Sequence, residues 1–96
     1  MEIQYSFKNF SDQEKAMLEQ YMAIKLPIIE KAVLRYSKPP HSLEVRAEKF
    51  VKKSAFNITF HLKTARASLM ASEDDHTIIE AIDLAKDKLV RQLTKK

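Results

Sequence analysis

The sequence of 96 residues contains no glycine and no cysteine. Average usage would place about seven glycines in a chain of this length. The P-loop, the dinucleotide-binding GxGxxG turn, the GxSxG elbow of hydrolases and the EF-hand loop all require glycine, so none of them is present. Without cysteine there is no disulfide, no thiolate nucleophile, no iron–sulfur cluster and no cysteine-ligated zinc. These absences exclude much of nucleotide-dependent, hydrolytic and redox chemistry.

Long apolar runs are also missing. Apolar residues make up 45% of the sequence and charged residues 31%, which is typical of a soluble globular chain, and no run approaches the roughly 18 apolar residues of a membrane span. The N-terminal residues do not have the pattern of a signal peptide. We therefore expect one domain over residues 1–96, located in the cytoplasm and not bound to a membrane.

Charge is distributed unevenly along the chain, whose net charge is +4. Residues 35–72 hold eight basic and two acidic side chains, and residues 84–96 hold five basic and one acidic. Between them, residues 73–83 hold five acidic side chains and no basic one. Such a basic middle and tail are consistent with a surface that binds a polyanion and equally with ordinary solvated faces, and both interpretations stay open at this level.

Alternation of apolar and polar residues predicts a first strand over residues 3–8. The capping box Ser11-Asp12-Gln13-Glu14 then predicts a helix from about Asp12. Apolar residues follow at spacings of three and four up to about Val33, so this helix presents one stripe to a core. Pro27 lies inside the stripe. Because proline removes an amide donor and clashes one turn back, we expect a kink at this position rather than a division of the helix.

Three further strands are predicted by alternation, over residues 43–48, 56–62 and 67–72. A second capping box, Thr77-Ile78-Ile79-Glu80, predicts a last helix that runs to about Leu93. The expected element order is therefore β-α-β-β-β-α. Four strands with one apolar face each call for two helices packed on one face of an open, antiparallel-type sheet, so the fold class is α+β.

Motifs for catalysis or metal binding are not found among the polar residues. The histidines His41, His61 and His76 lie far apart and none has a partner at metal-ligand spacing. We place His61 on the polar face of the sheet as an ordinary surface side chain. The acidic run Glu73-Asp74-Asp75 precedes a helix N-terminus, where the helix dipole favours such residues without a cation. We therefore expect no enzymatic activity, no cofactor, no metal and no small-molecule substrate.

The last helix carries the most specific pattern of charge. At about 100° per residue, Lys88, Arg91 and Lys95 fall on one ridge, away from the apolar stripe and spaced over about 10 Å. Such a ridge can engage successive phosphates of a nucleic-acid backbone. Arg46 and Lys49 belong to a second basic zone in the strand region, which strengthens this hypothesis.

Lys25 falls within the apolar stripe of the first helix, where an ammonium group needs a partner. Two interpretations stay open. The side chain either extends out between the helices towards Asp83, or it lines a basic groove between them.

The last helix also resembles a known one. Residues 81–93 read Ala81-Ile82-Asp83-Leu84-Ala85-Lys86-Asp87-Lys88-Leu89-Val90-Arg91-Gln92-Leu93. This segment is similar to the signature helix A-I-D-x-x-x-D-K-L-x-R-Q-L of the hibernation promoting factor family, also called ribosome-associated inhibitors or sigma-54 modulation proteins, and it matches every fixed position. Tyr21-Met22-Ala23-Ile24-Lys25-Leu26 and Val45-Arg46-Ala47-Glu48-Lys49 are similar to two further family patterns. The chain departs from the family at Lys63-Thr64-Ala65-Arg66, where relatives usually have a Gly-Gly turn.

The resemblance implies a fold related to double-stranded RNA-binding domains and the function of a ribosome hibernation factor. Such a protein binds the 16S-type rRNA of the small ribosomal subunit, in 70S ribosomes, within the decoding channel where mRNA and the A- and P-site tRNAs lie. Translation is then inhibited and idle ribosomes are preserved under stress. The basic positions that the resemblance carries over as rRNA-binding are Lys25, Arg46, Lys49, Lys88 and Arg91, and Lys95 extends the ridge.

The chain resembles the short form of this family or its isolated N-terminal domain. The alternative function comes from a different class. It is a protein-interaction module that recruits a polypeptide on the open sheet face or on an edge strand, with incidental affinity for RNA.

Overall fold

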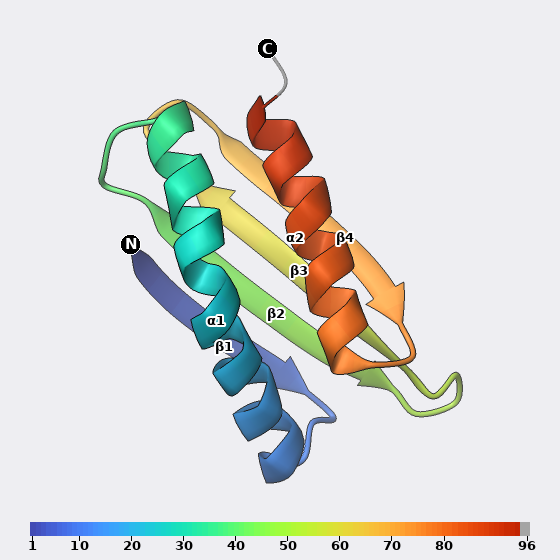
Figure 1. Ribbon diagram of the computed structural model, residues 1–96. Helices are drawn as coiled ribbons and strands as arrows, with labels where there is room; N and C mark the ends of the chain where they lie inside the picture. The colour runs from blue at the N-terminus through green and yellow to red at the C-terminus, as the bar shows by residue number, and fades with distance from the viewer. Residues whose placement is uncertain (95–96) are drawn as a thin grey trace.

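A computed structural model describes residues 1–94 and shows six elements of secondary structure (Figure 1). They are β1 (Glu2–Lys8), α1 (Asp12–Tyr36), β2 (Ser42–Phe50), β3 (Ala55–Lys63), β4 (Ser68–Asp75) and α2 (Ile78–Thr94). This order confirms the predicted β-α-β-β-β-α arrangement and the α+β class. The first helix extends three residues beyond the predicted end at Val33.

The strands form one sheet in the order β1-β2-β3-β4. β2, β3 and β4 pair in antiparallel fashion, whereas β1 runs parallel to β2, with Tyr5 opposite Val45. The prediction of an antiparallel-type sheet is therefore wrong for β1. The reason is that α1 connects β1 to β2, and a strand that returns through a crossing helix enters the sheet in its original direction. The sheet is thus mixed, with β1 and β4 at its two edges.

α1 begins at a complete capping box, as predicted. The Ser11 hydroxyl accepts a hydrogen bond from the Glu14 amide at 3.1 Å, and the Glu14 carboxylate accepts one from the Ser11 amide at 2.8 Å. The helix then continues through Pro27 without division, which confirms that part of the prediction. Both Pro27 and Ala23, whose carbonyl lies one turn earlier, are exposed. Water can therefore satisfy the carbonyl that loses its donor.

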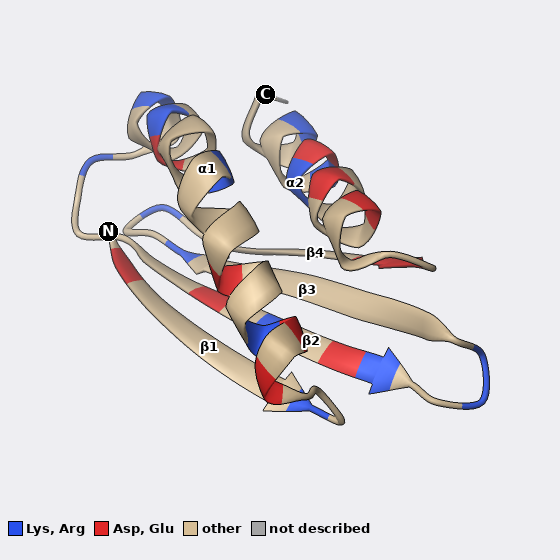
Figure 2. Ribbon diagram, turned by 60° about the horizontal axis from the view of Figure 1, so that its bottom comes forward, with Lys and Arg blue, Asp and Glu red and all other residues tan. Residues whose placement is uncertain are grey.

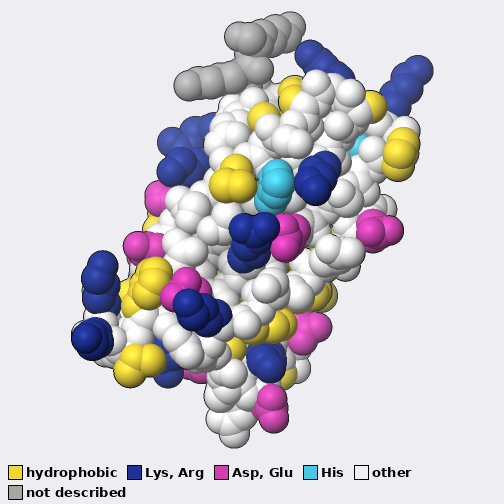
Figure 3. Space-filling model, turned by 180° about the vertical axis from the view of Figure 1, so that it is seen from behind, with side chains coloured by type: hydrophobic (Ala, Val, Ile, Leu, Met, Phe, Trp, Pro, Cys, Tyr) yellow, Lys and Arg dark blue, Asp and Glu magenta, His cyan; other side chains and the backbone are white. Residues whose placement is uncertain are grey.

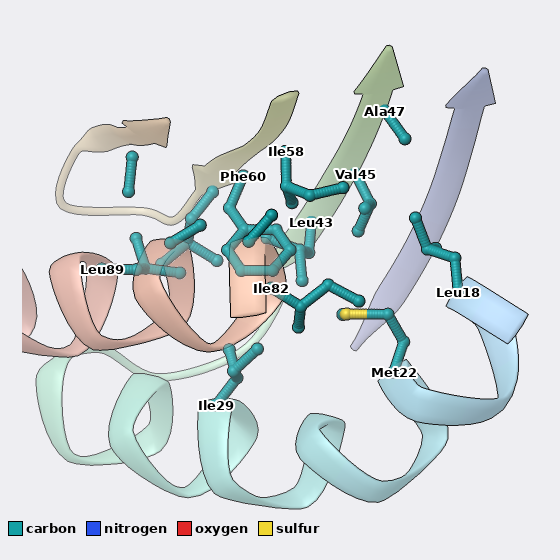
Figure 4. Close-up of a cluster of buried hydrophobic side chains, with 14 of the residues drawn as sticks. Leu18, Met22, Ile29, Leu43, Val45, Ala47, Ile58, Phe60, Ile82 and Leu89 are labelled. Carbon is teal, nitrogen blue, oxygen red and sulfur yellow. The ribbon is translucent and has the colours of Figure 1, made fainter. Parts of the chain in front are cut away.

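The hydrophobic core lies between the sheet and the two helices, which cover the same face (Figures 1 and 2). In Figure 4, Met22 and Ile29 of α1 lie near Ile82 of α2, on the side of Phe60 and Val45 that faces the helices. Each of these side chains is at most 1% exposed. Burial of one such side chain contributes about 1.5–3 kcal/mol to folding. The helices are therefore fixed on one face of the sheet, and the other face is open.

α2 begins after Thr77, and the predicted second capping box forms only in part. The Thr77 hydroxyl accepts a hydrogen bond from the Glu80 amide at 3.1 Å. The Thr77 amide donates to the Asp75 carboxylate at 3.4 Å, where a complete box would have the Glu80 carboxylate as acceptor. The pKa of Glu80 is raised, first by its hydrogen bond with Asp75 and then by the negative charge of that carboxylate. Asp75 therefore replaces Glu80 as the acceptor at this helix start.

Two residues other than glycine occupy the left-handed region of backbone conformation. They are Asn9, with φ of 63°, and Ser54, with φ of 49°. Asparagine adopts this conformation several times more often than most residues, whereas serine has no such preference. Ser54 lies in the β2–β3 connection, whose turn type the sequence does not reveal because it contains no glycine. The chain thus forms this turn without the residue best suited to it.

Candidate nucleic-acid interface

The exposed side of α2 carries the predicted ridge of cations. Its apolar stripe, which includes Leu89, is buried against the sheet, so Lys88 and Arg91 are exposed. Lys88 Nζ donates to the Ser72 carbonyl at 3.3 Å, and Arg91 Nε donates to the Asp87 carbonyl at 3.3 Å. In residues 1–94 no carboxylate lies within ion-pair distance of either head group. Both positive charges are therefore available to an external anion.

Lys25 lies between the two helices and is paired with α2. Its Nζ is 3.4 Å from Asp83 Oδ1 and 5.1 Å from the centre of the Tyr21 ring. The Tyr21 hydroxyl donates to both oxygens of the same carboxylate, at 2.8 and 2.9 Å. The pKa of Lys25 is raised, first by its contact with the Tyr21 hydroxyl and then by the charge of Asp83. Of the two interpretations from sequence, the extension towards Asp83 is confirmed.

Lys49 lies near the start of α1 and is also paired. Its Nζ is 3.1 Å from the Glu14 carboxylate and 5.7 Å from the centre of the Phe56 ring. The pKa of Glu14 is lowered, first by the hydrogen bond from the Ser11 amide and further by Lys49. Lys49 thus stabilises the capping box of α1, at the end of the molecule opposite the C-terminal half of α2 (Figure 1).

Arg46 lies on the open face of the sheet. Its guanidinium is 3.1 Å from the Glu44 carboxylate, and the His61 ring is 3.9 Å from the same carboxylate. The pKa of Glu44 is lowered, first by its hydrogen bond with Arg46. His61 lies on this polar face, as predicted. Figure 3 shows basic and acidic side chains interspersed on the open face, so this face does not present a patch of one sign.

The predicted site residues therefore do not form one surface. Lys88 and Arg91 lie together on α2, and Lys25 lies between that helix and α1. Lys49 is at the far end of the molecule, and Arg46 is on the opposite face of the sheet. Lys95 lies outside the described residues.

Basic residues from three elements surround one end of the molecule. Spacing in the sequence does not predict that they lie together. The C-terminal part of α1, the β3–β4 turn and the C-terminal part of α2 meet there (Figures 1 and 2). We call this group of residues the basic end. No carboxylate in residues 1–94 lies within 4 Å of their charged head groups. The members of the basic end are Lys31, Arg35, Lys38, Lys63, Arg66 and Arg91.

Arg66 fixes the β3–β4 turn to α1 at the basic end. Its guanidinium Nη1 donates to the Tyr36 carbonyl at 2.9 Å and lies 4.5 Å from the centre of the Tyr36 ring. The guanidinium thus satisfies one of the last carbonyls of α1 and adds a cation–π contact. The two residues are 30 positions apart, so sequence periodicity gives no signal for this contact.

The layer formed by α1 and α2, which we call the helix layer, carries the cations Lys88 and Arg91, which are unpaired within residues 1–94, on a small α+β domain that also has the basic end. Basic surfaces of this kind are typical of nucleic-acid-binding proteins. Residues 3–96 match the family described as "Sigma 54 modulation protein / S30EA ribosomal protein". The chain therefore belongs to this family of non-enzymatic, ribosome-associated factors, which confirms the resemblance found in the sequence.

Two solved structures share the fold at low sequence identity. The N-terminal domain of Protein Y from Thermus thermophilus has a TM-score of 0.70 at 19% identity, covering 97% of this chain and 96% of that domain. A ribosomal subunit interface protein from Coxiella burnetii has a TM-score of 0.66 at 15% identity, covering 98% of this chain and 94% of that one. No curated protein sequence matches this chain. None of the helices in residues 1–94 is long and apolar enough to cross a membrane.

Proposed function

We propose that this protein is a ribosome hibernation factor of the cytoplasm that binds the small ribosomal subunit. Its place there is the decoding channel, where it excludes mRNA and the A- and P-site tRNAs, inhibits translation and preserves idle 70S ribosomes under stress. The observation that carries this proposal is the pair of exposed, carboxylate-free cations Lys88 and Arg91 on the helix layer. Membership of the family supports the same function.

Inhibition by this mechanism requires only that the protein occupies the decoding channel. It involves no chemical reaction. Cations that contact phosphates position a protein on RNA without reading its sequence, and RNA duplexes are recognised largely by shape and backbone. Lys88 and Arg91 are three residues apart on a helix, so their head groups reach neighbouring points along a backbone. Once the cations hold the domain on the rRNA, its folded body prevents tRNA from entering the same space.

Lys88 and Arg91 form the centre of the proposed interface, and the basic end extends it past Arg91. Lys25 contributes only in part, because Asp83 competes with rRNA phosphate for its ammonium group. The remaining proposed contacts are Lys49, Lys95 and Arg46, of which Arg46 reaches the rRNA only if the open sheet face also lies against it. A charge reversal of Arg46 is therefore expected to weaken binding less than a reversal of Lys88.

Co-sedimentation of the purified protein with ribosomal subunits and 70S particles tests the proposal. We expect co-migration with the small subunit and with 70S particles. The logarithm of the binding constant should fall linearly with the logarithm of the salt concentration. The double variant Lys88→Glu/Arg91→Glu should lose this binding and reduce the salt slope by about two.

A matched control reverses the same number of charges at the tip of the β2–β3 hairpin. Lys52→Glu/Lys53→Glu leaves the helix layer unchanged and should bind ribosomes more tightly than the α2 variant. If both double variants bind equally well, the interface does not involve α2. Protein that stays at the top of the gradient at low salt would overturn the proposal and favour the alternative of a protein-interaction module.

A further inference from the structure

The two edges of the sheet differ in how their backbone groups are covered. At β4, Gln92 Nε2 donates to the Met70 carbonyl at 2.9 Å, and Lys88 Nζ donates to the Ser72 carbonyl at 3.3 Å. These two side chains of α2 cover carbonyls that point away from β3. For β1, in contrast, no side chain in residues 1–94 forms a hydrogen bond with the backbone. β4 is thus covered at two of its carbonyls, whereas, within residues 1–94, β1 is bare along its length.

The backbone orientation of β1 follows from one hydrogen bond. The Glu2 amide donates to the His41 carbonyl at 3.2 Å, so the backbone groups of Glu2 face the β2 side. Because these groups alternate in direction along a strand, the amides and carbonyls of Ile3, Tyr5 and Phe7 point outwards. β1 therefore offers three donors and three acceptors in a row, which is a template for another strand.

We propose that β1 pairs in antiparallel fashion with β1 of a second copy of this chain, with the two Tyr5 residues opposite each other. A two-fold axis then passes between the tyrosines, and the two sheets become one continuous sheet. Ile3 of each copy lies opposite Phe7 of the other. Each of the three facing pairs of outward residues exchanges two backbone hydrogen bonds.

Charge complementarity selects this register. With Tyr5 at the centre, Glu2 of each copy lies opposite Lys8 of the other, on the open face of the sheet. If the register shifts by two residues in either direction, Glu2 of one copy no longer lies opposite Lys8 of the other. A slip of one residue turns the apolar side chains to the wrong face. The proposed pairing is therefore the register in which both ends of β1 meet an opposite charge.

The apolar side of β1 also gains contacts in this dimer. Ile3, Tyr5 and Phe7 face the helix layer but are only half-buried, unlike their counterparts in β2. The rings of Tyr5 and Phe7 are stacked with centroids 6.1 Å apart, and that stack extends along the edge. A second copy would cover this side of the stack. An interface of one strand pair is small, so we expect a reversible dimer whose population depends on concentration.

Analytical ultracentrifugation over a concentration series tests the charge complementarity. Glu2→Lys and Lys8→Glu each place like charges opposite one another twice per dimer, and each should weaken dimerisation about tenfold. The double variant Glu2→Lys/Lys8→Glu restores opposite charges and should dimerise like the parent. Both side chains are exposed, and the ion pair of Lys8 with Glu48 at 3.8 Å lies at the surface, where such pairs contribute little to stability, so circular dichroism should show an unchanged fold. A parent protein that is monomeric up to millimolar concentration, or single variants that dimerise normally, would overturn the proposal.

Cross-linking tests the register, and the absence of cysteine makes it free of background. In the proposed dimer, Gln4 of one copy lies opposite Ser6 of the other, at a spacing that suits a disulfide. Both side chains are exposed. Gln4→Cys and Ser6→Cys proteins should be mixed in equal amounts and oxidised. The disulfide-linked mixed dimer should then make up far more than half of all dimers, which is the fraction that random pairing gives. A random distribution of the three dimers would contradict the register. Neither experiment contains ribosomes, so its result is independent of the proposed function.

Discussion

The ammonium group of Lys25 and the carboxylate of Asp83 form an ion pair across the space between α1 and α2, with Nζ 3.4 Å from Oδ1. The Tyr21 hydroxyl donates to the same carboxylate. A cation within the apolar stripe of α1 is thereby satisfied by the neighbouring helix. The same pair keeps Lys25 from acting as a free cation on the helix layer.

Removal of the Asp83 carboxylate should make Lys25 available to an external anion. For Asp83→Asn we expect tighter binding to ribosomes at low salt and a salt slope steeper by about one, because one further phosphate contact forms. Binding titrations over a salt series measure both effects. Asp12→Asn is the control, since it changes the net charge equally at the N-terminal end of α1. Equal effects of the two variants would show that Lys25 does not gain a contact.

Glu14 should contribute to stability in a way that depends on pH. Its pKa is lowered in the folded protein from the ordinary value of 4.5. The resulting stabilisation is therefore present above pH 4.5 and is lost as the pH falls through the folded-state pKa. We expect Glu14→Gln to unfold at a lower temperature than the parent at pH 7, with a difference that shrinks below pH 4.5, as followed by circular dichroism.

Ser11→Ala provides the comparison for Glu14→Gln. It removes a capping oxygen that does not titrate and should destabilise the protein by about 0.5–2 kcal/mol. This loss should remain at acidic pH, where that of Glu14→Gln disappears. A Glu14→Gln variant whose deficit does not change with pH would assign the effect of Glu14 to packing rather than to charge.

Glu80 should have the opposite dependence on pH. Its folded-state pKa is raised above 4.5 by Asp75, so the charged form is disfavoured in the folded protein and stability is lost as the pH rises through 4.5 to that value. We expect Glu80→Gln to unfold at a higher temperature than the parent at pH 7. The two proteins should converge at pH 4 and below, where Glu80 is protonated. Thermal unfolding over this pH range gives the result, and a variant less stable than the parent at pH 7 would contradict it.

Ser54 is a position where glycine should stabilise the protein. Its φ of 49° is in the left-handed region, which costs a residue with a Cβ atom about 1–2 kcal/mol. We expect Ser54→Gly to raise the free energy of unfolding by up to about 1 kcal/mol, because the greater entropy of glycine in the unfolded chain offsets part of the gain. Urea denaturation measures the change. Asn9→Gly, at φ of 63°, should gain less because asparagine tolerates this conformation. Equal gains at the two positions would argue against this explanation.

The fold was largely predictable because its signals are local. The capping box at Ser11, the alternation in each strand and the apolar stripes of both helices depend on residues within a few positions of one another. The direction of β1 was not predicted correctly, since alternation gives the face of a strand and not its direction. It follows from the crossover through α1, which is a property of the whole chain.

The candidate site was predictable only where its residues share one helix. Lys88 and Arg91 lie on one ridge, as helical spacing indicates. The partners of Lys49 and Arg46 depend on which strands and helices become neighbours, so their pairing with Glu14 and Glu44 could not be read from the sequence. The same holds for Arg66, whose partner Tyr36 belongs to a distant element.

The unequal edges of the sheet limit how far this protein can assemble. A molecule with two bare edges can add a neighbour on each side, and its assemblies then grow without end into fibres. Here Lys88 and Gln92 occupy outward carbonyls of β4, so among residues 1–94 only the β1 edge is bare along its length. When two copies pair through β1, the outward backbone groups of β1 are hydrogen-bonded in both of them. In the proposed dimer, growth by strand addition is therefore expected to stop at two molecules.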